Sequence, residues 1–282
     1  MKKVFLIFAL QAFALSVFAQ TQDVSTTGGT PNITLTPLAT KSAAIAPPSN
    51  ELFNNGPIIN SPGTGSGGAD ESVLQNTSLS MGTFGFGFQT SAGNSVADDF
   101  TFTQSSDINQ IKVFAYQTGS STTSSITAVY LQIYDGQPGA GGNVIWGDLS
   151  TNRLASTTWS EIYRVQETSS GTTDRPIMEC VCDVNTTLPA GTYWLEIQVD
   201  GSLASGPWCP SVTITGNSTT GNAIQYTNDS GNWNSLLDLG TNTPQGVPFI
   251  ITGFTAVPLH PGYFAGLFAL LAVTVIVRRR FF

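Results

Sequence analysis

The sequence predicts an all-β protein, a two-sheet antiparallel β-sandwich resembling a jelly roll. Short runs rich in Val, Ile, Tyr, Phe and Thr recur about every ten residues, separated by Gly, Asn, Asp and Pro. No helical period of any length interrupts these runs, and charged residues make up only 10% of the chain. These observations favour two packed antiparallel sheets over a parallel sheet with crossover helices.

The first residues have the layout of a secretory signal peptide. Lys2 and Lys3 precede an apolar stretch from Val4 to Phe18, with small residues at Ser16 and Ala19. We expect a signal helix over residues 1–19, cleavage after Ala19 and a mature chain that starts at Gln20. The alternative is an uncleaved N-terminal anchor.

Residues 20–70 are dominated by Thr, Pro, Gly, Ser and Asn, as in "TTGGTPNITLTP" and "SPGTGSGGAD". Such a composition buries too little apolar surface to offset the entropy lost on ordering. We therefore expect a flexible leader here and a β-sandwich domain over residues 71–255.

The expected strands follow one another along this domain. In chain order they are "SVADDFTF", "INQIKVFAYQ", "ITAVYLQIYDG", "SEIYRVQE", "RPIMECVCDV", "GTYWLEIQVDG", "SVTITG", "AIQYTN" and "PFIITGF".

Alternation along two of these strands predicts a face that carries both aromatic and amide side chains. In "TYWLEIQVD" the core side is apolar, which leaves Trp194 and Gln198 opposite it. In "AVYLQIYD" the same period leaves Tyr130, Gln132 and Tyr134 outward. Because rings stack on sugars while amides bond to hydroxyls, these five residues are a candidate carbohydrate-binding face. The alternative is that the aromatic residues form cross-strand pairs or lie under loops.

Two other groups of side chains are candidates for sites. Asp98 and Asp99 in "ADDF", with Asp135 in "YDGQPG", offer oxygen ligands for a structural Ca²⁺, and turn or strand-edge acids are the alternative. Three cysteines remain after export, and strand period points Cys180 and Cys182 into the core. They are either three buried thiols or one disulfide from Cys180 or Cys182 to Cys209, since neighbours at i and i+2 seldom bond to each other.

Several activities have no support in the sequence. The single histidine, His260, lies beside the C-terminal apolar segment, so a histidine-based nucleophilic or zinc centre has no base in the domain. The sequence "GAGG" lacks the continuation of a phosphate-binding loop. Without the basic residues of the two ends, five basic residues face 18 acidic ones, a net charge of −13 that argues against a nucleic-acid partner. Paired carboxylates of a glycoside hydrolase remain a minor alternative.

The region from Ser95 to Phe254 resembles an uncharacterised domain of secreted and surface bacterial proteins. The resemblance is carried by "VADDF", "YLQIYDGQPGAGG", "VIWGDLSTNRLAST", "NTTLPAGTYWL" and "DGSLASGPW". It implies an extracellular domain joined to a sorting tail, with no established activity.

Residues 257–282 form the second terminal signal. Gly262–Val277 is uncharged and, with its flanks, approaches the ~20 residues that span a bilayer, and Arg278, Arg279 and Arg280 follow. A short motif, an apolar helix and an arginine cluster together resemble the PEP-CTERM and IPTL-CTERM sorting signals, which imply processing by an exosortase-type transpeptidase. The motif here is Val257, Pro258, Leu259, His260 and Pro261. Leu259 and His260 replace the Glu-Pro of the first type, and an ordinary single-span anchor is the alternative.

These observations predict an exported, non-enzymatic β-sandwich protein with a structural or adhesive role in the cell envelope. It would be held by its C-terminal transmembrane helix or sorted to the cell surface. A carbohydrate-binding module with polysaccharide as its partner is the alternative. We expect no cofactor beyond a structural Ca²⁺.

Overall fold

The computed structural model describes Gln22–Val24 and residues 51–255. The described chain is all-β, as predicted, with fifteen strands and three short 3₁₀ turns: η1 (Ser66–Gly68), η2 (Thr90–Ala92) and η3 (Glu167–Ser169). Among the described residues, no helix is long and apolar enough to cross a bilayer. The predicted signal helix and C-terminal helix lie outside the described residues.

The strands form two six-stranded sheets and a smaller third sheet. The first sheet has the order β2 (Glu51–Asn54), β15 (Phe249–Thr255), β6 (Ser106–Ala115), β10 (Pro176–Leu188), β9 (Leu154–Gln166) and β3 (Asp70–Leu74). The second sheet has the order β14 (Asn232–Ser235), β13 (Ile224–Thr227), β5 (Ser95–Phe102), β11 (Gly191–Gly201), β7 (Ile126–Tyr134) and β8 (Val144–Asp148). The end sheet has the order β1 (Gln22–Val24), β4 (Thr83–Gly87) and β12 (Trp208–Pro210).

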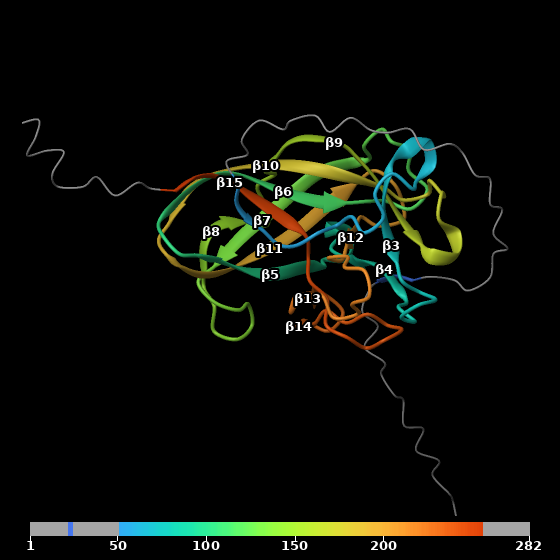
Figure 1. The fold of residues 1–282 in the computed structure, drawn as a ribbon. Coiled ribbons are helices and arrows are strands. Elements are labelled where there is room, and N and C mark those ends of the chain that lie inside the picture. Colours follow the sequence, from blue (N-terminus) through green and yellow to red (C-terminus); the bar gives the residue numbers. More distant parts are fainter. Residues whose placement is uncertain (1–21, 25–50, 256–282) are drawn as a thin grey trace, which may run out of the picture.

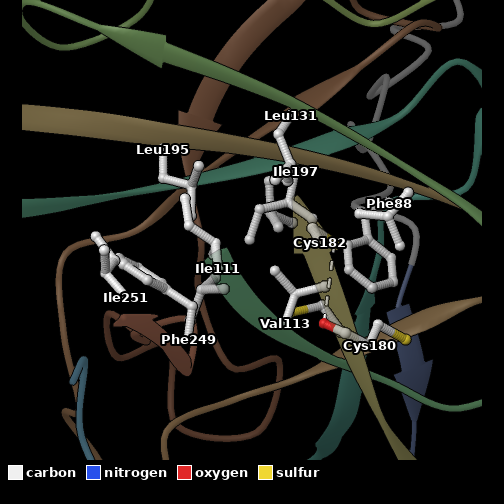
Figure 2. Close-up of a cluster of buried hydrophobic side chains, with 14 of the residues drawn as sticks. Phe88, Ile111, Val113, Leu131, Cys180, Cys182, Leu195, Ile197, Phe249 and Ile251 are labelled. Atoms are coloured by element: carbon white, nitrogen blue, oxygen red, sulfur yellow. Dashed lines mark hydrogen bonds between the residues drawn. The ribbon is translucent and has the colours of Figure 1, made fainter. Parts of the chain in front are cut away.

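The main core lies between the first and second sheets. Figure 1 shows β6, β10 and β15 in one layer and β5 and β11 in the layer beneath it. The apolar side chains that alternation turns inward meet here, such as Ile111 and Val113 from β6 and Leu195 and Ile197 from β11. In Figure 2 these side chains converge with Phe249 and Cys182 into one packed cluster.

The end sheet is a third layer that the sequence did not predict. Phe114 and Tyr116 point outward from the first sheet, yet they are buried in a second apolar cluster with Phe84 and Ile177. The strand β4 that covers them has only buried residues. A Cβ at Gly85 would lie 2.6 Å from the Tyr116 hydroxyl, so this close approach requires glycine. The predicted two-sheet arrangement is therefore wrong in one respect, because outward aromatic residues on β6 required a cover of their own.

One strand pair departs from the predicted antiparallel pattern. β3 runs parallel to β9, with Glu71 opposite Tyr163 and Val73 opposite Val165. Parallel pairing needs a long connection. The chain supplies it here, since the five strands β4–β8 lie between these two strands in sequence.

The folded body begins before the predicted residue 71. β2 pairs with β15, and the Phe53 ring lies 5.9 Å from that of Phe100 and 5.6 Å from that of Phe249. Residues 51–70 are thus part of the body and not of a flexible leader, because Phe53 supplies apolar surface that the mean composition of the segment hides. The predicted strand "SVTITG" is also wrong: these residues form a loop, in which the Val212 amide donates to Gly246 and the Thr213 amide to Pro57.

Candidate functional site

The structure brings the five predicted carbohydrate-binding residues onto one face of the second sheet. β7 and β11 are neighbours, and their register places Trp194 opposite Tyr134 and Gln198 opposite Tyr130. Gln132 lies opposite Glu196 in the same register. Alternation turns all of these side chains to the outer side of the second sheet, away from the main core.

Two further aromatic residues join this face from the hairpin of β13 and β14. Tyr226 and Trp233 are opposite each other, with ring centroids 5.7 Å apart at an interplanar angle of 58°. Trp233 was not among the predicted site residues, although its place between two asparagines in "GNWNS" alternates polar and aromatic side chains as in β7 and β11. We define the aromatic face as the half-buried side chains of Tyr130, Gln132, Tyr134, Gln198, Tyr226 and Trp233.

Trp194 lies beneath this face instead of on its surface. Its side chain is only 8% exposed and packs with Ala97, Ile224, Tyr134 and Trp233. The expectation that the Trp194 ring contacts a sugar is therefore wrong, because the β13–β14 hairpin extends the sheet beside β5 and brings Trp233 over it. Trp194 supports the exposed rings from below.

A hydrogen-bonded network of four side chains holds the middle of the aromatic face. The Tyr134 hydroxyl lies 2.7 Å from Glu196 Oε2 and 2.9 Å from Gln132 Oε1, and its single proton is shared between these acceptors. Ser95 Oγ donates to Glu196 Oε1 at 2.6 Å. Burial raises the pKa of the Glu196 carboxyl. Burial, with the neighbouring Glu196 carboxylate, raises the pKa of Tyr134 far above its usual value, so the phenol stays protonated and keeps donating.

The edges of the aromatic face are held in the same way. Gln198 Nε2 donates to the Asn94 carbonyl at 3.0 Å, and the Tyr130 hydroxyl lies 3.5 Å from Asp200 Oδ2. Burial and the Asp200 charge both raise the pKa of Tyr130. The face thus combines fixed ring edges with amide and carboxylate groups at defined positions, which is the chemistry that recognises sugar hydroxyls and apolar sugar faces.

The three predicted calcium ligands are not brought together. Asp98 is 2% exposed and points into the space between the sheets, where it accepts from Asn55 Nδ2 at 2.6 Å and from the Val247 amide at 2.8 Å. Asp99 points to the other side of β5 and accepts from Asn222, and Asp135 accepts from the Asn143 amide. Adjacent residues of a strand face opposite ways, so "ADDF" does not form one ligand set. In the described ranges no three Asp, Glu, His or Cys side chains gather at a candidate metal position.

All three cysteines are buried free thiols. Cys180 and Cys182 point into the main core from β10, as alternation predicted, and Cys209 lies on β12 of the end sheet. Burial raises the pKa of Cys180 to about 12 and that of Cys182 well above its usual value, so both remain thiols at neutral pH. The predicted bridge to Cys209 is absent from this structure, and the alternative of three buried thiols describes it.

The predicted sorting residues Val257, Pro258, Leu259, His260 and Pro261, with the arginines at 278–280, lie outside the described residues, as does the predicted signal peptide. Comparisons with protein-family models, with curated proteins and with solved structures gave no match to this chain.

Proposed function

We propose that this protein is an exported, non-enzymatic structural or adhesive component of the cell envelope. In this proposal the signal peptide directs export, and the body is a jelly-roll-like sandwich. The C-terminal helix and arginine cluster attach it to the membrane until an exosortase-type transpeptidase sorts it to the surface. The observation that supports a structural role most directly is how the buried carboxylates are used.

Three buried acids bind the loops and strands of the body together. Glu71 accepts from Thr64, Ser170 and the Gly171 amide, at 2.7 Å in each case. Asp238 accepts from the amides of Gly82, Thr83, Gly240 and Thr241 at 2.8–3.0 Å. Asp98 joins β5 to Asn55, which follows β2, and to Val247, which precedes β15. The bonds to Glu71 and Asp238 fix loops in place, which suits a body that keeps its shape outside the cell.

The test of this proposal is fractionation of the producing cells, with mass spectrometry of the mature termini. We expect the protein in the envelope fraction with Gln20 at its N-terminus. A mature chain without Phe281 and Phe282 supports sorting, whereas a chain that retains them supports a simple anchor. Cytosolic protein that still begins at Met1 would refute the export on which the proposal depends.

Carbohydrate binding is the second candidate function, and the aromatic face favours it. The half-buried rings of Tyr134, Tyr226 and Trp233 lie beside the amides of Gln132 and Gln198 on one sheet face. An adhesive protein that holds polysaccharide needs such a surface.

Tryptophan fluorescence tests this candidate. The full chain in a detergent without a sugar headgroup is titrated with soluble polysaccharides such as dextran, galactomannan and β-glucan. We expect a change in emission with at least one of them, and its loss in Trp233→Ala. Trp159→Ala, which removes a half-buried tryptophan from the first sheet, is the matched control. An unchanged spectrum with all polysaccharides, or equal loss in both variants, would count against the aromatic face.

A further inference from the structure

A second polar surface lies on the first sheet, where β15, β6 and β10 are neighbours. It is an open groove of about 500 Å³. We call it the polar groove and define it by its lining residues, Asn109, Gln110, Asp183, Asn185, Thr252 and Gly253. The groove faces outward from the first sheet, whereas the aromatic face lies on the outer side of the second sheet. The two surfaces are therefore on opposite sides of the main core.

Aligned bulges produce the polar groove. The register of β10 against β6 passes from Asp183 opposite Gln110 directly to Thr186 opposite Ile108. The register of β15 against β6 changes at the same level, between Thr252 and Gly253. Bulges are features that re-aim side chains, and they are common next to functional sites.

The bulges place consecutive residues on the same side of the sheet. Ile108 and Ile111 of β6 are both buried in the core, so Asn109 and Gln110 between them both lie on the outer side. On β10, Asn185 adopts a left-handed φ of 51°, a conformation that asparagine tolerates better than most residues. A Cβ at Gly253 would overlap the Asp107 carbonyl, so only glycine fits on β15 beside the extra β6 residue Asn109.

Five of the six lining residues have side chains that end in hydrogen-bonding groups, and some of these groups are available to a ligand. Gln110 Nε2 donates to Asp183 Oδ1 at 3.0 Å, and Thr252 Oγ1 donates to the Gln110 carbonyl at 3.3 Å. The side chains of Asn109 and Asn185 are exposed and make no hydrogen bond within the described part of the chain. Each free amide offers one acceptor and two donor hydrogens.

This set of groups selects a neutral ligand with many hydroxyls. The Asp183 carboxylate, with Asp107 close by on β6, disfavours anions. Asp183 is the one carboxylate among the lining side chains, which is poor for Ca²⁺ because it takes six to eight oxygens and prefers several charged ligands. Amides beside a carboxylate match vicinal hydroxyls, because each amide donates and accepts hydrogen bonds while the carboxylate accepts them.

We propose that the polar groove binds a saccharide unit of a neutral polysaccharide through hydrogen bonds to its hydroxyls. The site goes beyond the aromatic face and is independent of it. If both bind, one molecule holds glycan on two opposite sides, which would let it cross-link a polysaccharide matrix.

Amide NMR of the ¹⁵N-labelled full chain tests the groove, in micelles of a detergent without a sugar headgroup. The probes are cellohexaose, maltoheptaose and isomaltohexaose, each titrated to its solubility limit. We expect at least one probe to shift the backbone amide signals of Asn109, Asp183 and Asn185. Asn109→Ala combined with Asn185→Gly should weaken that binding about tenfold or more. Glycine keeps the positive φ at residue 185, and Gln104→Ala, which removes an exposed amide outside the groove, should change nothing.

The results that would overturn the proposal are distinct from those that test the aromatic face. Shifts that follow only the aromatic face and disappear only in Trp233→Ala would refute the groove and leave carbohydrate binding there intact. Groove shifts produced by CaCl₂ alone would make it a cation site, and no groove shift with any probe would refute it outright. If the double variant loses its native spectrum, Asp183→Asn replaces it, since this substitution keeps the shape and removes the charge.

Discussion

The outer faces of the two large sheets differ in what covers their aromatic residues. On the first sheet Phe114 and Tyr116 point away from the main core and are buried under β4 and β12. On the second sheet Tyr130 and Tyr134 also point away from the core, and they remain half exposed. The local pattern of alternating side chains is the same in both sheets. Alternation therefore fixes the side of the sheet on which a residue lies, whereas a segment distant in sequence decides whether that side is core or surface.

The largest expected effect is a difference between Tyr116→Ala and Tyr134→Ala. Both substitutions remove the same atoms from an outward position. Tyr116→Ala should lower the free energy of unfolding by about 4 kcal/mol, because it empties a fully buried site under the end sheet. Tyr134→Ala should cost about 1–2 kcal/mol, since part of its ring is already in water. Urea unfolding measures both, and equal losses would mean that the two faces are covered alike.

The next effect concerns Asp98, which ties the two sheets together. Burial raises the pKa of Asp98 to about 7 against the effect of its hydrogen bonds, and the neighbouring Asp99 charge adds to the rise. Between about pH 4 and pH 7 the folded protein therefore holds a proton that the unfolded chain has released. The stability from this proton is complete below about pH 4. It falls progressively as the pH rises from 4 to 7, and it is gone above the folded pKa of about 7.

Asp98→Asn, which stays neutral throughout, should remove this pH dependence. The free energy of unfolding of the variant relative to the original chain should rise by on the order of 3 kcal/mol between pH 4 and pH 8. Urea unfolding at a series of pH values measures it, and the comparison with the original chain removes the contribution of other acids. A difference that does not change with pH would contradict the assigned role of Asp98.

Gly85→Ala tests how closely the end sheet approaches the first sheet. A new Cβ would lie 2.6 Å from the Tyr116 hydroxyl and 2.9 Å from the Cys209 carbonyl, so the substitution should cost about 2 kcal/mol. In a Tyr116→Phe background the cost of Gly85→Ala should fall, because the Tyr116 hydroxyl, the atom nearest to the new Cβ, is absent. Thermal unfolding of the four chains in this cycle gives the coupling, and a coupling of zero would contradict the contact.

The smallest expected effect is that of Tyr134→Phe. It removes the hydroxyl that lies 2.7 Å from Glu196 and leaves the ring in place. We expect a loss of about 1 kcal/mol, as for a typical hydrogen bond. A fluorescence response to polysaccharide carried by the rings should survive it. Loss of the response with unchanged stability would mean that the hydroxyl itself contacts the sugar.

Local pattern was sufficient to predict much of the main body. Runs such as "SVADDFTF" and "GTYWLEIQVDG" became β5 and β11, and the faces expected for Leu195 and Trp194 are the observed ones. The third layer was not predicted, because the glycines of "MGTFGFGF" are atypical of a strand. They are needed in β4 because its backbone approaches Tyr116 closely.

In the candidate site, too, the local pattern was predictable and the contacts between distant segments were not. Alternation placed Tyr130, Gln132, Tyr134 and Gln198 together on one face, and β7 and β11 are indeed neighbours. The burial of Trp194 could not be predicted, since it depends on Trp233 from a hairpin distant in sequence. The polar groove was missed for a different reason: bulges break the period of two that sequence reasoning uses.

Hydroxyl-radical footprinting with mass spectrometry tests most directly whether the end sheet buries the outer aromatic residues of the first sheet while those of the second sheet stay accessible to solvent. We expect Tyr134, Tyr226 and Trp233 of the full chain to be oxidised readily, while Phe114 and Tyr116 are protected until the protein unfolds. Oxidation of Tyr116 at the rate of Tyr134 in the native protein would contradict it.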